Sequence, residues 1–164
     1  MILLWQPADE QELEVMVRAS EKLNGPCAIR SPKSLPSVLG GSIEIGKWRL
    51  VQEGNDFALV AGGRAVQTAI KTAKLLEKEG LHACVWSVST LDENAVPELS
   101  DYAVIEESAG AGGLAEWLSE KQKPLAVFNA GRHIPAENDL DSLDCECGMC
   151  PETIACEILK IRKS

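Results

Sequence analysis

The sequence predicts an α/β fold with a mostly parallel sheet and one antiparallel edge strand. Short apolar runs alternate along the chain with longer segments whose apolar residues recur every three or four positions. This alternation is typical of helices that cross between parallel strands. One connection differs, because the tight turn at Gly54-Asn55-Asp56 separates two strand-like runs. Tight turns join antiparallel neighbours, so we expect the strand around 49–51 to form an antiparallel edge.

The first thirty residues predict a strand, a helix and a second strand. Pro7 stops the run ILLWQ, and Asp9 is placed to cap the helix that follows. The phrase Asn-Gly-Pro at 24–26 stops that helix, and residues 27–30 resume as a strand. The pattern is that of one crossover unit from a parallel sheet. The Ser-, Pro- and Gly-rich residues 34–46 then predict a linker.

The rest of the chain predicts four further strands and four helices. The strands are expected within FALVAGG, LHACVWSVS, DYAVIEES and KPLAVFNAG, and the helices at 66–76, 92–99, 110–121 and 151–163. Pro151 suits the first turn of the last helix. Cys27 and Cys84 lie inside strands and are expected to be buried.

Length and charge exclude several classes of function. With 164 residues and 45% apolar side chains, the chain can form one domain with an appendage. A net charge of -9 disfavours binding to nucleic acid. No apolar run approaches the roughly 20 residues of a membrane span, and the N-terminal segment lacks the features of a signal peptide. We therefore expect a cytoplasmic protein without a membrane partner.

A glycine-rich bend follows two carboxylates in EESAGAGG. Glu106 and Glu107 end a strand, and Gly110, Gly112 and Gly113 precede a helix. Backbone N–H groups at such a bend can hold an anion, and the carboxylates could hold a cation. They could equally cap the bend or be solvated charges at the end of a strand.

Cysteines gather in the segment DCECGMCPETIAC. Cys145, Cys147 and Cys150 are close in sequence, and Cys156 lies on the helix that follows. Thiols at this spacing could hold a metal, react as redox groups near a helix N-terminus, or be inert. Neither His82 nor His133 has a neighbouring nucleophile in the sequence, so no catalytic pair is predicted.

Taken together, the motifs resemble the C-terminal part of transketolase-type thiamine-diphosphate enzymes, with 1-deoxy-D-xylulose-5-phosphate synthase the most similar in phrasing. Pro7, Asp9, Glu12 and Leu13 match a P-x-D-x-x-E-L segment of that family. The phrases GPCAIRSPK, IEIGKW, ALVAGG, EESAGAGG and CGMCPE follow in the family's order. The resemblance covers nearly the whole chain.

The resemblance implies a three-layer domain at 47–164, a linker at 34–46, and at 1–33 the tail of a pyrimidine-binding domain. It also implies that Arg30 faces a substrate phosphate. RSPK replaces the family's R-Y-P-R, although Lys33 could supply a second positive charge. Thiamine diphosphate and Mg²⁺ would be bound in the assembled enzyme by other domains, since the chain has no Gly-Asp-Gly motif. We expect no cofactor to be bound by this chain alone. Cys147 and Cys150 occupy positions that are structural in the family.

Two functions follow from these patterns. The first is a C-terminal domain or subunit of a transketolase-like or synthase-like transferase, which serves assembly and dimer contacts and is inactive alone. Its expected partners are copies of itself, a chain carrying the cofactor-binding domains, or both. The alternative is a free-standing regulatory, redox or metal-binding domain that uses the cysteines.

Overall fold

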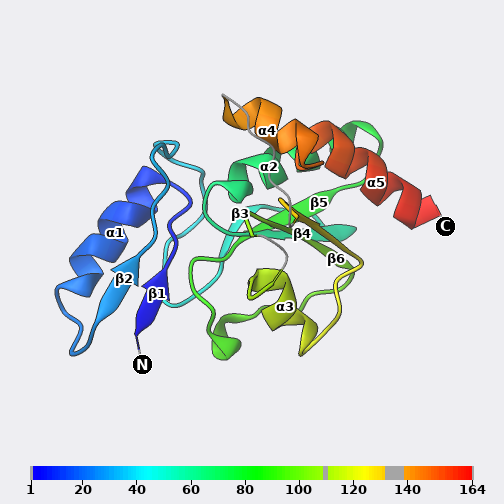
Figure 1. The fold of residues 1–164 in the computed structure, drawn as a ribbon. Coiled ribbons are helices and arrows are strands. Elements are labelled where there is room, and N and C mark those ends of the chain that lie inside the picture. Colours follow the sequence, from blue (N-terminus) through cyan, green and yellow to red (C-terminus); the bar gives the residue numbers. More distant parts are fainter. Residues whose placement is uncertain (1, 109–110, 132–138, 164) are drawn as a thin grey trace.

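The computed structural model describes residues 2–108, 111–131 and 139–163. Figure 1 shows a small N-terminal unit beside a larger layered domain. The elements, in chain order, are β1 (Leu3–Trp5), α1 (Glu10–Ser20), β2 (Cys27–Ile29), β3 (Arg49–Gln52), β4 (Phe57–Ala61), α2 (Ala65–Lys78), β5 (Ala83–Ser87), η1 (Glu93–Ala95), β6 (Tyr102–Glu106), α3 (Leu114–Ser119), β7 (Ala126–Asn129), α4 (Leu140–Glu146) and α5 (Pro151–Lys163).

The larger unit is a three-layer α/β domain, as the sequence predicts. Within the described residues its sheet has five strands in the order β3-β5-β4-β6-β7. β4 pairs in parallel with β5 and β6, and β6 pairs in parallel with β7, whereas β3 is antiparallel to β5. α2 and α5 pack on one face, and α3 covers the other (Figure 1).

The antiparallel edge is confirmed, but its neighbour differs from the one that the tight turn implies. β3 pairs with β5, and not with β4, which follows it in the chain. The connection crosses the start of β5, where a Cβ at Gly54 would collide with the backbone of Ala83 and Cys84. The backbone N–H of Asp56 donates to the carbonyl of His82 at 3.0 Å. Glycine therefore lets the chain pass close over β5 and leave β3 on its far side.

Two helices also differ from the sequence prediction. The helix expected at 92–99 is only the short 3-10 turn η1, because Val96 precedes Pro97 and has an extended ψ of 117°. Conversely, α4 is not anticipated, although Asp139 caps it by accepting the N–H of Ser142 at 2.9 Å. α4 is short and three of its residues are acidic, so its sequence does not show the helical periodicity of apolar residues.

The N-terminal unit is the predicted crossover, with β1 and β2 parallel and α1 between them in the chain. It is joined to the larger domain by backbone hydrogen bonds, such as Gln6 N–H to the Ser89 carbonyl at 2.9 Å. Among the residues that the structure describes, no helix has the length and apolar character needed to cross a membrane.

Candidate functional site

A cavity of about 930 Å³ lies where the N-terminal unit meets the carboxyl ends of β4 and β6. β4 is followed by α2 on one face of the sheet and β6 by α3 on the other, so the two connections diverge. Divergent connections leave a crevice at the ends of parallel strands, which is where α/β proteins commonly bind ligands. The topology therefore makes this cavity the principal candidate site.

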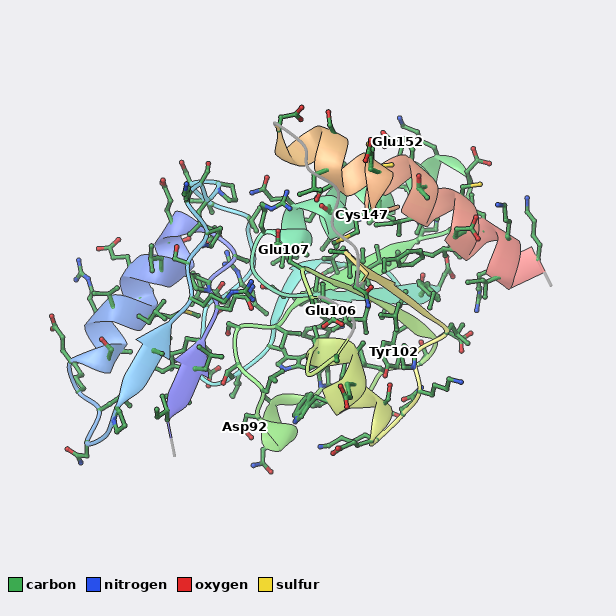
Figure 2. The ribbon with its side chains drawn as sticks, in the orientation of Figure 1. Asp92, Tyr102, Glu106, Glu107, Cys147 and Glu152 are labelled. Atoms are coloured by element: carbon green, nitrogen blue, oxygen red, sulfur yellow. The ribbon has the colours of Figure 1, made fainter. Side chains whose placement is uncertain are left out.

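The walls of the cavity combine apolar and acidic residues with one arginine. Leu4 and Trp5 line the side of the N-terminal unit, together with Arg30. The opposite side carries carboxylates of the larger domain, which are labelled in Figure 2: Asp92, Glu106 and Glu107. The charged lining of the cavity is thus mainly negative.

Glu106 caps a helix from inside the protein. Its side chain is buried, and one carboxylate oxygen accepts the N–H of Ala115 in the first turn of α3 at 3.3 Å. A Cβ at Gly113 would collide with this carboxylate, so glycine allows the carboxylate to approach the helix without shifting. Capping is one of the roles that the sequence allows for Glu106, and the hydrogen bond from Ala115 is consistent with it.

Glu107 belongs to an ion-pair network with Arg64, which lies between β4 and α2. Arg64 Nε donates to Glu107 at 2.6 Å, and its two terminal nitrogens donate to Asp144 of α4 at 2.8 and 3.0 Å. Hydrogen bonding to Asp144 raises the pKa of Arg64 above its ordinary value, with Glu107 adding to the effect against partial burial. The guanidinium of Arg64 thus links the carboxyl ends of β4 and β6 to α4.

The glycine-rich bend itself is held by an internal bond, since Gly112 N–H donates to Glu116 at 2.6 Å. Gly110 lies outside the described residues. Within the described part of the chain, no group of three or more His, Cys, Asp or Glu side chains is placed to hold a metal ion. Ion binding at this bend stays a prediction, without a metal cluster to support it.

Arg30 and Lys33 are both exposed, and only Arg30 lines the cavity. The backbone N–H of Arg30 donates to the Trp5 carbonyl at 2.8 Å, which extends the pairing of β1 with β2. The arginine therefore stands at the carboxyl end of β2, the position that the sequence indicated. Lys33 follows in the connection to the larger domain.

The four C-terminal cysteines do not form one cluster. Cys145, in α4, and Cys150, directly before α5, lie on either side of one hydrogen-bonded turn. Cys147 is partly buried against the core, and Cys156 is exposed on α5. Cys27 and Cys84 are only half-buried, which corrects the prediction that strand cysteines here are core residues.

Among the residues that the structure describes, the most buried ion pair is one that the sequence did not predict. Asp9 and Arg49 form an ion pair at 2.9 Å, and their side chains are 0% and 1% exposed. Asp9 also accepts the N–H groups of Glu12 at 2.7 Å and Leu39 at 2.8 Å. Glu12 in turn accepts the N–H of Ala8, the residue before the N-cap, at 2.8 Å, an arrangement similar to a capping box. This buried acidic cap joins α1, the linker and β3.

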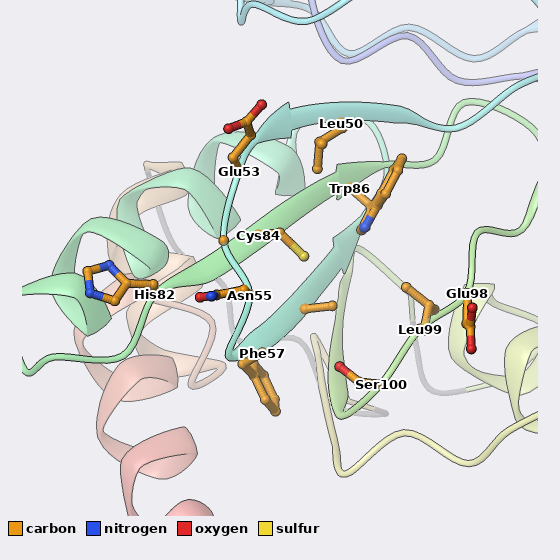
Figure 3. A pocket seen from close by; sticks show the side chains of 12 residues that line it. Leu50, Glu53, Asn55, Phe57, His82, Cys84, Trp86, Glu98, Leu99 and Ser100 are labelled. Atoms are coloured by element: carbon orange, nitrogen blue, oxygen red, sulfur yellow. The ribbon is translucent and has the colours of Figure 1, made fainter.

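A second hollow of about 690 Å³ lies on the β5 side of the sheet (Figure 3). Cys84 and Trp86 of β5 line it together with Leu99, and His82 and Glu98 are also part of its lining. Burial raises the pKa of the Cys84 thiol, which disfavours its nucleophilic thiolate form.

Comparison with known families identifies the larger domain. The family model described as "Transketolase, C-terminal domain" matches residues 46–128. Among curated proteins, 1-deoxy-D-xylulose-5-phosphate synthase of Magnetococcus marinus is 31% identical over 138 residues, covering 78% of this chain and 22% of the synthase. The synthase of Caldanaerobacter subterraneus subsp. tengcongensis is 29% identical over 176 residues, covering 97% of this chain and 28% of that protein. The chain thus spans less than a third of the length of these relatives.

Solved structures share the whole fold. A chain described as a split gene transketolase in an inactive beta4 tetramer superposes with a TM-score of 0.80 at 24% identity, over 98% of this chain and 57% of the other. A transketolase from Pichia stipitis gives a TM-score of 0.78 at 21% identity, over 98% of this chain and 25% of that one. At these identities the likeness establishes the fold alone.

Proposed function

The chain belongs to the family of transketolase C-terminal domains, and from this membership we propose that it is the assembly domain of a thiamine-diphosphate-dependent transferase. The transferase would be of the transketolase or 1-deoxy-D-xylulose-5-phosphate synthase type. Other domains of the enzyme would bind the cofactor and Mg²⁺, on the same polypeptide or on a partner. By itself, residues 1–164 would be inactive.

The observation that carries this proposal is the two-stranded parallel sheet of the N-terminal unit. Parallel sheets are normally covered on both faces, and a sheet of two strands is marginal by itself. Here Ile2 is 66% exposed and Leu4 of β1 is 56% exposed. We infer that further strands, supplied by a pyrimidine-binding domain, extend this sheet and cover its apolar residues.

The relatives support the same interpretation. The synthases continue well beyond the region matched here, so their remaining length can contain the cofactor-binding domains. The split gene transketolase is described as an inactive tetramer of its beta chains. We propose that this chain likewise forms homo-oligomers, joins a chain carrying the cofactor-binding domains, or does both, in the cytoplasm.

Arg30 is the residue that we propose for substrate recognition, with Lys33 as a secondary contribution. Both side chains are exposed, and Arg30 lies at the cavity beside the open sheet. A guanidinium can hold a phosphate through paired hydrogen bonds. In the assembled enzyme, Arg30→Ala is expected to raise KM for a sugar phosphate roughly tenfold or more with a smaller change in kcat. The matched control is Lys22→Ala, which also removes an exposed positive charge from the N-terminal unit.

A pull-down tests the assembly role. The tagged chain is incubated with lysate of the source organism, thiamine diphosphate and Mg²⁺, and the bound proteins are identified by mass spectrometry. We expect recovery of a chain carrying a Gly-Asp-Gly cofactor motif. Leu4→Asp should abolish this recovery, whereas Leu125→Asp, at a residue that is 47% exposed before β7, should not.

Activity measurements supply the contrary outcomes. The purified chain is assayed for ketol transfer and for decarboxylating condensation, with thiamine diphosphate and Mg²⁺ present. Turnover by the chain alone would overturn the proposal that it is an inactive assembly domain. Equal recovery of the cofactor-binding chain by wild type and Leu4→Asp would refute the open sheet as the docking surface.

A further inference from the structure

The corner between α4 and α5 brings two cysteines together. Cys145 lies in the last turn of α4, and Cys150 immediately precedes α5. Between them Gly148 has a φ of 72°, and its N–H donates to the Cys145 carbonyl at 3.1 Å. The N–H of the buried Met149 donates to the carbonyl of Asp144 at 2.6 Å. A hydrogen-bonded turn, anchored in the core by Met149, thus sets the positions of both thiols.

Cys150 has the surroundings of a helix cap. Its carbonyl accepts the N–H of Ile154, and its sulfur lies 3.0 Å from the hydroxyl of Thr153. The Thr153 hydroxyl, at the start of the 13-residue helix α5, can donate to this sulfur and so stabilise negative charge on it.

The two thiols differ in acidity. Partial burial raises the pKa of Cys150, but the hydrogen bonds from Thr153 and Cys145 outweigh burial and the nearby charge of Glu152, so this pKa is lowered. The hydrogen bond with Cys150 raises the pKa of Cys145, and Glu152 and Asp144 raise it further. Cys150 is therefore the more acidic thiol of the pair, and Cys145 is the less acidic one.

From this corner we propose a reversible modification site, in which Cys145 and Cys150 form a disulfide by exchange with a small-molecule or protein disulfide. This modification involves only the two cysteine sulfurs and the oxidant, and no metal ion takes part. The site is accessible, since Cys145 is exposed and Cys150 is partly exposed. It does not depend on the assembly role proposed above.

The exchange balances in two steps. Cys150 first loses its thiol proton to water, and the resulting thiolate attacks one sulfur of the oxidant RSSR, forms a mixed disulfide and releases RS⁻. Cys145 then loses its proton to this thiolate or to water, attacks the Cys150 sulfur and releases the second RS⁻. The products are the Cys145–Cys150 disulfide and two RSH, so the protein loses two electrons and two protons, which the oxidant gains.

The bond would tie the end of α4 to the start of α5. Asp144, next to Cys145, holds Arg64 through two hydrogen bonds, and Arg64 binds Glu107 at the candidate cavity. Oxidation would therefore restrain the helix turn that carries this ion-pair network. Reduction by excess thiol would release it.

The test uses the full chain with oxidised glutathione, followed by alkylation of remaining thiols and peptide mass spectrometry. In wild type we expect loss of two hydrogens within the segment containing both cysteines, reversed by dithiothreitol. Cys145→Ser should instead accumulate glutathione on Cys150, because the resolving thiol is absent. Cys156→Ser, which removes an exposed thiol on the same helix, should leave the disulfide yield unchanged.

Measuring alkylation rates without oxidant tests the reactivity of Cys150 separately from disulfide formation. Iodoacetamide at neutral pH should alkylate Cys150 at least about threefold faster than Cys156. Thr153→Val, which removes the hydroxyl at the sulfur, should reduce that advantage. Equal labelling of Cys150 and Cys156, or separate glutathione adducts on Cys145 and Cys150 in wild type, would overturn the proposal.

Discussion

Removing either partner of the Asp9–Arg49 pair should destabilise the whole protein. Both side chains are buried, and Arg49 Nε and Nη2 have no partner within the described residues. Asp9→Asn keeps an N-cap acceptor but leaves the guanidinium uncompensated, which is expected to cost about 3–5 kcal/mol. Arg49→Met leaves Asp9 with the N–H groups of Glu12 and Leu39, so its cost should fall at the lower end of that range.

A double-mutant cycle measures the coupling between the two side chains. Urea unfolding followed by far-UV circular dichroism gives the free energy of unfolding for wild type, both single variants and the double variant. We expect the double variant to lose at least about 2 kcal/mol less than the sum of the single losses. The exposed pair Glu14–Arg18, at 2.5 Å, is the control and should show almost no coupling. A coupling energy below about 0.5 kcal/mol for Asp9–Arg49 would refute the reasoning.

Two further predictions concern buried charges. Burial raises the pKa of Glu12, against the Ala8 hydrogen bond and the charge of Arg49, so the folded state holds this proton more tightly than the unfolded chain. That stabilisation is lost as pH rises above about 4.3. In urea unfolding, Glu12→Gln should therefore gain stability relative to wild type between acidic and neutral pH. Parallel curves of unfolding free energy against pH for the two proteins would contradict this. Arg64→Lys removes the two-pronged contact with Asp144 and is expected to cost about 1–2 kcal/mol in thermal unfolding; an unchanged Tm would contradict this.

Local signals predicted much of the fold because they act over a few residues. Asp9 caps α1, Pro151 begins α5, and the alternation of apolar runs with helical periods produces the parallel sheet. In each case the deciding contact lies within about one helical turn or one strand.

Contacts between distant segments could not be predicted in this way. Asp9 and Arg49 are separated by 40 residues, and nothing in either local sequence indicates that they meet. The position of β3 beside β5 depends on how Gly54 packs over the start of β5, which is a tertiary contact. The network of Arg64 with Glu107 and Asp144 joins three segments in the same manner. The spacing of residues along the sequence does not indicate which of these distant side chains contact each other.

The charges of the cavity bear on what Arg30 can do. Its cavity also holds Asp92, Glu106 and Glu107, and of these Glu107 is paired with Arg64 and Glu106 caps α3. A phosphate that approached Arg30 from this side would meet net negative charge, which opposes binding. Phosphate recognition by Arg30 therefore requires additional cations from the domain that we propose extends the β1–β2 sheet. This argument predicts that the chain alone binds sugar phosphates weakly, and that affinity measured by calorimetry rises only when the partner is present.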